Sequence, residues 1–175
     1  QRLSVLRELE KNMDGYQNSV KAVMRAAGAR RLRGVIGPVS AILTVEPGCE
    51  VAVETALGGA LQNIVVENEA AAKAAIALLR SDNAGRATFL PMSAIRGDML
   101  REPRLSQEYG FVGIASQLVT YDPQYDGIFQ NLLGRTVVVE DLDCGVNMAR
   151  RYQNRFRIVT LDGQVINLSL IHISE

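Results

Sequence analysis

An internal repeat is the feature of this sequence that most restricts the folds it can adopt. Residues 34–47, GVIGPVSAILTVEP, resemble residues 110–123, GFVGIASQLVTYDP, which begin 76 positions further along the chain. The register extends to residues 57–58 over residues 133–134 and gives seven identities in 25 positions. This agreement indicates a duplicated unit and predicts two lobes of similar fold.

Each copy continues with the pattern of a strand, a helix and a second strand. The strand candidates are short apolar runs, which are typical of buried strands, and the helix of the first copy is rich in Ala and Leu. The predicted elements are 64–67, 69–79 and 86–90 in the first copy, and 137–140, 144–152 and 157–161 in the second. The sequence therefore predicts an α/β fold of mixed α+β character, in which two similar strand–helix–strand lobes have adjoining sheets.

The N-terminal segment has the heptad pattern of a coiled coil. Apolar side chains recur at alternating steps of three and four residues, over about three heptads. This stripe is narrower than the apolar face of a helix that packs on its own domain, which favours a partner helix from elsewhere. An amphipathic helix lying on the chain's own globular part is the alternative. The predicted seam consists of Leu6, Leu9, Met13, Tyr16, Val20, Val23 and Ala27.

The sequence offers no set of residues typical of catalysis or metal binding. It has no phosphate-binding G-x-x-x-x-G-K-[ST] loop. Its one histidine, His172, lies three residues from the end, and Cys49 and Cys144 match no metal-ligand spacing. We therefore expect no enzymatic activity, no metal and no cofactor in this chain. Two lone cysteines, and apolar runs shorter than the roughly 18 residues that span a bilayer, favour a cytoplasmic protein without a membrane partner.

Basic residues form two clusters in stretches that contain no acidic residue, 15–45 and 144–161. The whole chain has 19 basic and 19 acidic residues, so only local clustering can indicate nucleic acid. Clustered Lys and Arg attract phosphates of any base sequence, and a solvated helix face with one or two ion pairs is the alternative. The candidate DNA-binding residues are Lys21, Arg25, Arg30, Arg31, Arg33, Arg150 and Arg151.

Five segments resemble the hinge domain of bacterial structural-maintenance-of-chromosomes (SMC) proteins. Residues 15–24 resemble the junction between coiled coil and hinge, and residues 34–43 resemble the first hinge strand and turn. Residues 56–66 and 85–91 are similar to the two most recognisable hinge signatures. Residues 156–167 resemble a strand near the end of the hinge, so the resemblance covers about 15–167 and implies the SMC hinge fold.

The resemblance implies a module that dimerises a chromosome condensation and segregation ATPase and binds DNA weakly, without sequence preference. In that family two hinges form a homodimer, and the heads bind ATP and Mg²⁺ and join the kleisin complex. The resemblance places those heads outside this segment, and it implies a nucleoid-associated protein of the cytoplasm. The alternative is a duplicated regulatory domain that binds a small molecule between its lobes.

The last residues depart from the family pattern. After residues 165–167 the family continues into a Pro-Gly-Gly and Gly-Gly motif at the dimer interface, whereas this chain reads LSLIHISE. We expect this segment to be non-native and its replacement of the glycine motif to weaken the homodimer. The predicted organisation is the end of an N-terminal coiled-coil arm at 1–28, hinge lobe one at 29–96, a connector at 97–109, hinge lobe two at 110–167 and a non-native tail at 168–175.

Overall fold

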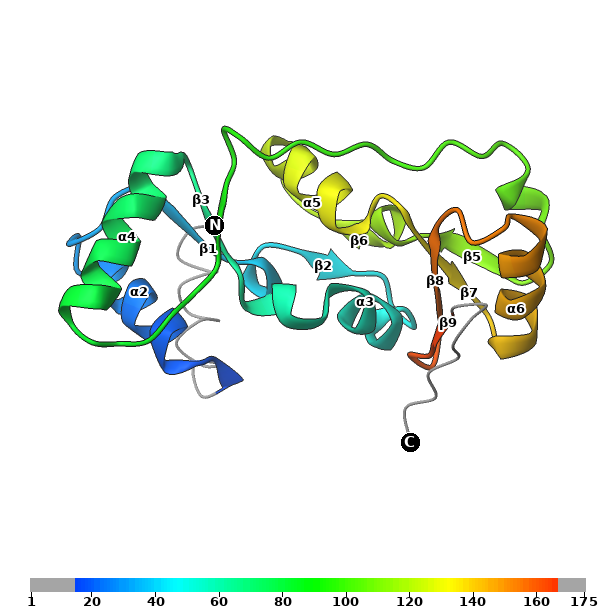
Figure 1. Cartoon of the computed structure of the whole chain (residues 1–175), viewed down its shortest axis with the longest axis horizontal. Helices are drawn as coiled ribbons and strands as arrows, with labels where there is room; N and C mark the ends of the chain where they lie inside the picture. Colours follow the sequence, from blue (N-terminus) through cyan, green and yellow to red (C-terminus); the bar gives the residue numbers. More distant parts are fainter. Residues whose placement is uncertain (1–14, 167–175) are drawn as a thin grey trace. The chain divides into compact units, whose positions relative to one another are not determined.

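The computed structural model describes residues 15–166, and the chain packs into two compact units (Figure 1). Of the described residues, unit 1 comprises 15–43 together with Gly59–Ile95, and unit 2 comprises Thr44–Gly58 together with 96–166. The predicted lobes follow the repeat in the sequence, whereas these units follow packing, which groups residues 44–58 of the first copy with the second half of the chain. The predicted mixed α/β class is confirmed.

Unit 1 is a three-stranded sheet packed against two helices that contact each other. Strand β3 lies in the middle, antiparallel to β1 and parallel to β4. Small side chains on α4, at Ala71, Ala72 and Ala75, let α2 approach closely, so Val20 and Val23 are fully buried between the helices and the sheet. The elements are α2 (Asn18–Gly28), β1 (Val35–Pro38), the 3₁₀ helix η2 (Val39–Ala41), β3 (Ile64–Val66), α4 (Glu69–Ser81) and β4 (Phe89–Pro91).

Unit 2 is a four-stranded sheet in the order β5-β7-β8-β9, together with the two-stranded ribbon β2-β6. Helix α6 packs on strands β7, β8 and β9, and helix α3 contacts β8 and α5. The regular elements are β2 (Thr44–Val45), α3 (Glu50–Leu57), β5 (Phe111–Ile114), β6 (Val119–Thr120), α5 (Asp126–Leu133), β7 (Thr136–Val139), α6 (Leu142–Arg151), β8 (Arg157–Thr160) and β9 (Val165–Ile166). The 3₁₀ helices are η4 (Leu105–Gln107), η5 (Ala115–Leu118) and η6 (Pro123–Tyr125) in unit 2, and η3 (Gly58–Gln62) where the chain passes from unit 2 back to unit 1.

The strand pairings repeat the duplication seen in the sequence. The antiparallel pairs β1-β3 and β5-β7 both carry an irregularity at the same repeat position, between Val35 and Gly37 and between Phe111 and Gly113. The pairs β3-β4 and β7-β8 are both parallel, with the helix α4 or α6 between them in the chain. The predicted strand–helix–strand pattern of each copy is therefore confirmed.

The helices that link these strands begin with equivalent caps. The side chain of Asn68 accepts a hydrogen bond from the amide of Ala71, and Asp141 accepts one from the amide of Cys144, both at 2.9 Å. Each cap satisfies one of the backbone donors that the first turn of a helix leaves unpaired. The hydrogen bond from the Cys144 backbone also lowers the pKa of the Asp141 carboxyl, because it favours the charged form.

Within unit 2, part of the first copy pairs with its own counterpart from the second copy. Thr44 of β2 lies opposite Thr120 of β6 in the antiparallel ribbon, and these are equivalent residues of the repeat. The helices that follow, α3 and α5, contact each other, and their equivalent residues Val53 and Phe129 are 1% and 0% exposed. Residues 44–58 are therefore part of the core of unit 2.

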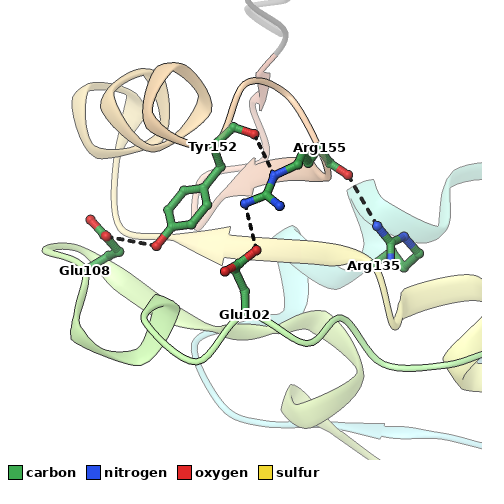
Figure 2. Close-up of polar contacts among 5 residues, drawn as sticks. All are labelled: Glu102, Glu108, Arg135, Tyr152 and Arg155. Atoms are coloured by element: carbon green, nitrogen blue, oxygen red, sulfur yellow. Dashed lines mark hydrogen bonds and ion pairs between the residues drawn. The ribbon is translucent and has the colours of Figure 1, made fainter.

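The segment predicted as a connector packs on unit 2 through both apolar and charged contacts. Leu100 and Leu105 are buried in the core that contains α6. Glu102 forms an ion pair with Arg155 at 2.7 Å, and Glu108 accepts a hydrogen bond from the Tyr152 hydroxyl at 3.0 Å (Figure 2). This segment is thus a strap held along unit 2.

The predicted coiled-coil seam falls partly outside the described residues. Among its members that the structure describes, Val20 and Val23 face the core of unit 1, which is the arrangement of the alternative interpretation. Tyr16 hydrogen bonds with the Ser40 hydroxyl at 2.7 Å, and Ala27 is half-buried. Leu6, Leu9 and Met13 lie outside the described residues, as does the predicted tail at 168–175. The coiled-coil arm stays a prediction.

Candidate functional site

The first basic cluster lies on α2 and on the turn that follows it. After the last residue of the helix the chain turns sharply, because Arg30 adopts a left-handed conformation with φ of 62°. The amide of Arg31 then donates to the carbonyl oxygen of Ala26 at 2.8 Å, and the buried side chain of Leu32 anchors the turn. Arg30, Arg31 and Arg33 are consequently held on an exposed and well-defined turn.

Most of this cluster carries charge that no described carboxylate offsets. Arg31 forms an ion pair with Asp82 at 3.6 Å, but the two side chains are 60% and 42% exposed, so the pair is weak. The other basic residues of α2 and its turn make no ion pair with any residue between 15 and 166. We name the five residues the α2 cluster: Lys21, Arg25, Arg30, Arg31 and Arg33.

The second predicted cluster lies on the last turn of α6, where positive charge is favourable because of the helix dipole. Arg151 forms an ion pair with Glu108 of the strap, whereas Arg150 is exposed and has no ion pair within the described part of the chain. Part of the positive charge at this site is thus already neutralised. The α2 cluster belongs to unit 1 and this pair belongs to unit 2, so each is a separate candidate surface.

A third set of basic residues was not predicted as a site from the sequence. Arg135, Arg155 and Arg157 line one hollow on unit 2. Arg155 and Arg157 fall in the second acid-free stretch, but Arg135 stands alone between α5 and β7 in the sequence. No signal in the sequence joins Arg135 to the others, because only the pairing of β7 with β8 brings the starts of these two strands together.

The two sheets differ at one edge. In unit 2 the strand β9 pairs antiparallel with β8, and Ile158 lies opposite Ile166. The equivalent strand of unit 1, β4, pairs with β3 alone among the strands of residues 15–166. Phe89 of β4 holds the repeat position of Ile158. An unpaired strand edge presents backbone donors and acceptors that another strand can bind.

The thiols and phenol with altered acidity lack the properties of catalytic groups. Burial is the main cause that raises the pKa of the Cys49 thiol, and the hydrogen bond with Asp141 is the main cause that raises the pKa of the Cys144 thiol. Burial also raises the pKa of Tyr121 to about 12. Both thiols therefore stay protonated at neutral pH and are poor nucleophiles. Within residues 15–166 no three His, Cys, Asp or Glu side chains are grouped to hold a metal ion.

Residues 15–166 contain no helix that is long and hydrophobic enough to cross a bilayer.

Comparison with known proteins gives consistent similarities. Residues 32–149 match the family described as "SMC proteins Flexible Hinge Domain". The chain is 39% identical over 166 residues to "Chromosome partition protein Smc" of Bacillus subtilis and 40% identical over 169 residues to that of Desulfitobacterium hafniense. These matches cover 93% and 95% of this chain, which spans about 14% of the length of each relative.

Solved structures of SMC hinge domains are also similar to this chain. An asymmetric dimer of the Geobacillus stearothermophilus SMC hinge domain matches with a TM-score of 0.89 and 37% identity, over 99% of this chain and 74% of that one. The Pyrococcus furiosus SMC hinge domain matches with a TM-score of 0.74 and 25% identity, over 99% of this chain and 88% of that one.

Proposed function

This chain belongs to the family of SMC flexible hinge domains, and from that membership we propose that it joins two copies of a chromosome partition protein as a homodimer. The observation that carries this proposal is the open edge of β4, considered together with the similar Geobacillus stearothermophilus structure, which is that of a hinge dimer. The hydrolysis of ATP, with its Mg²⁺, and the contact with the kleisin belong in this proposal to the heads of the whole protein. The hinge itself binds no cofactor, and the protein acts on the nucleoid in the cytoplasm.

The repeat suggests how the dimer forms. In unit 2 the outer edge of β8 is covered by a strand of the same chain, whereas the equivalent edge of β4 has no described partner. Exposed strand edges of this kind are stabilised when another strand adds its backbone hydrogen bonds. The proposal is that a strand of the second copy occupies, beside β4, the place that β9 occupies beside β8.

Amide hydrogen exchange tests this edge without any substitution. We expect the Phe89 amide to exchange about tenfold more slowly when the protein concentration is raised until light scattering shows a dimer, because the new strand protects it. The amide of Ile158, at the equivalent position but already beside β9, should exchange at the same rate throughout. A dimer in which the Phe89 amide keeps its monomer rate would exclude this edge, and a monomer at every concentration would exclude the homodimer.

We propose in addition that the α2 cluster binds DNA phosphates weakly and without sequence preference. Its arginines are exposed on a turn whose backbone is fixed, and carboxylates offset little of their charge. Guanidinium groups bind phosphate oxygens through paired N–H donors, and the release of counterions makes such binding fall steeply with salt. The pair Arg150 and Arg151 is the weaker candidate, because Glu108 neutralises Arg151.

Charge reversal within the α2 cluster should abolish this binding. We expect the triple variant R30E/R31E/R33E to bind a duplex oligonucleotide at least about tenfold more weakly than the parent at low salt, with a shallower salt dependence. Fluorescence anisotropy at several salt concentrations measures both quantities. The control R80E/R86E/R104E has the same net charge but alters exposed residues outside both clusters. Equal losses in the two variants would mean that net charge alone, and not the α2 cluster, governs binding.

The regulatory-domain alternative is not favoured. The family match and the relatives named above are all SMC hinges or chromosome partition proteins, and none is described as a metabolite-binding protein.

A further inference from the structure

A hollow on unit 2 brings together three arginines from two neighbouring strands and their preceding turns. It has a volume of about 720 Å³ and lies at the start of β7 and β8, where Arg135, Arg155 and Arg157 line it. Asn131 and Asn154 line the same hollow, and the side-chain amide of Asn131 already donates to the carbonyl oxygen of Arg96 at 2.9 Å. The residues around it are thus rich in hydrogen-bond donors, and its arginines make it strongly basic.

Two of the three arginines are held by neutral groups. Arg135 donates from Nη2 to the carbonyl oxygen of Arg155 at 3.4 Å (Figure 2), and Arg157 donates from Nη1 to the carbonyl oxygen of Ala56 at 2.7 Å. Neither has a carboxylate partner among residues 15–166. Since a guanidinium has five N–H donors, each retains donors for a ligand. Each guanidinium is thus oriented by one hydrogen bond to a neutral carbonyl oxygen, and no carboxylate of residues 15–166 offsets its charge.

The third arginine has a structural role. Arg155 forms an ion pair with Glu102 at 2.7 Å, donates from Nε to the carbonyl oxygen of Tyr152 at 3.2 Å, and lies over the ring of the same tyrosine (Figure 2). These contacts hold the strap against unit 2. They also fix the backbone carbonyl of Arg155, which in turn positions the guanidinium of Arg135.

The repeat shows that the fold does not require arginine at the two uncompensated positions. The strand registers make Val137 equivalent to Ile64 and Ile158 equivalent to Phe89, because the members of each pair occupy the same place in their sheets. Gln62 and Thr88 therefore hold the places of Arg135 and Arg157 in the first copy. The first copy builds the same strand pair with neutral side chains at these two places.

We propose that this hollow binds a phosphate-type oxyanion, with Arg135 and Arg157 as its principal ligands. The planar guanidinium presents paired donors that match the spacing of phosphate oxygens, and two such groups with unpaired charge attract a dianion more strongly than one. The phosphate comes either from a nucleic-acid backbone or from a small phosphate ester, since both present the same oxyanion. This site is distinct from the α2 cluster and from the β4 edge.

The substitutions that test the site are taken from the first copy. The variant R135Q/R157T places in unit 2 the residues that unit 1 already has, and the single variant R135Q keeps the hydrogen bond from Arg157 to Ala56. The control R80Q/R104Q removes two exposed arginines elsewhere. Each full chain is titrated with inorganic pyrophosphate by calorimetry and with a labelled DNA duplex by anisotropy, after its thermal midpoint has been compared with that of the parent.

We expect the double variant to lose affinity for at least one probe by about tenfold or more relative to the control, and R135Q to lose part of it. A loss for pyrophosphate identifies a small phosphate ester, and a loss for the duplex alone identifies a nucleic-acid backbone. Affinities equal to those of the control for both probes would overturn the site. The variant R30E/R31E/R33E should bind pyrophosphate like the parent, which separates this site from the proposed DNA surface.

Discussion

Replacement of Gly110 by alanine should destabilise unit 2 by about 3 kcal/mol, as the sum of backbone strain and overpacking. Gly110 has φ of +81°, in the left-handed region that side chains disfavour. A Cβ atom there would clash with the Sγ atom of Cys144 and lie 2.6 Å from its Cβ atom. The Gly110 carbonyl also accepts a hydrogen bond from the Glu140 amide at 2.8 Å, so the backbone cannot move away without breaking a link to the start of α6.

Alanine substitutions at two other glycines separate the cost of backbone strain from the cost of overpacking. Gly48 has φ of +90°, and a Cβ atom added there would have open space around it, so Gly48→Ala should cost only the backbone strain of about 1 kcal/mol. Gly34, the repeat equivalent of Gly110, would meet the Cβ atom of Ala71 at 3.0 Å, so Gly34→Ala should fall between the two. Urea denaturation of the three variants measures the order. Equal costs for the Gly48 and Gly110 variants would show that Cys144 imposes no packing constraint.

Replacement of Val53 by aspartate should unfold unit 2 although residue 53 belongs to the first copy of the repeat. Val53 is 1% exposed, and α3 contacts β8 and α5. A carboxylate buried there without a partner costs several kcal/mol, which we place at about 4 kcal/mol or more. Hydrogen exchange should show lost protection in β5, β7 and β8, with β1 and β3 still protected.

The control for this variant lies on the same helix. Val51 is 50% exposed, so Val51→Asp introduces the same charge at a position that faces solvent and should change the free energy of unfolding by less than about 1 kcal/mol. If Val53→Asp instead removed protection from β1 and β3, residues 44–58 would belong to the core of unit 1.

The sequence was sufficient to predict the duplicated elements, but not which unit contains residues 44–58. The repeat located the strands and helices of both copies, and the structure confirms the strand–helix–strand order in each. It could not assign residues 44–58 to a unit, because periodicity shows which side chains are buried and not which surface buries them. Val53 and Phe129 are apolar at equivalent positions, and either unit could have accepted α3 on that evidence.

The sequence pattern was also unable to identify the surface that covers the apolar stripe of the first helix. Steps of three and four residues predict a narrow buried face, and Val20 and Val23 are indeed buried. The surface that covers them is α4, whose Ala71, Ala72 and Ala75 admit a close neighbour. Those alanines lie about fifty residues further along, and no pattern within the helix itself points to them.

The basic residues show a different limit. Counting acid-free stretches found the α2 cluster, because its members are close in sequence. It missed Arg135, which lines the same hollow as Arg157 because β7 and β8 pair in parallel. The sequence repeat did not mark Arg157 either, because it aligned residues 86–90 with 157–161 and so placed Arg86 opposite Arg157. The strand registers of the structure are needed to show that Thr88 is its equivalent.

The grouping of Thr44–Gly58 with unit 2 has a consequence for synthesis on the ribosome. The backbone passes from one unit to the other three times, after Leu43, after Gly58 and after Ile95. During synthesis α3 therefore leaves the ribosome before β7 and β8 have been translated. Its apolar face cannot be buried in unit 2 until those strands have emerged as well. Unit 2 is completed only after β9 has been translated, and a gene divided after Ile95 would leave the product that contains β5 to β9 without one of the helices of its unit.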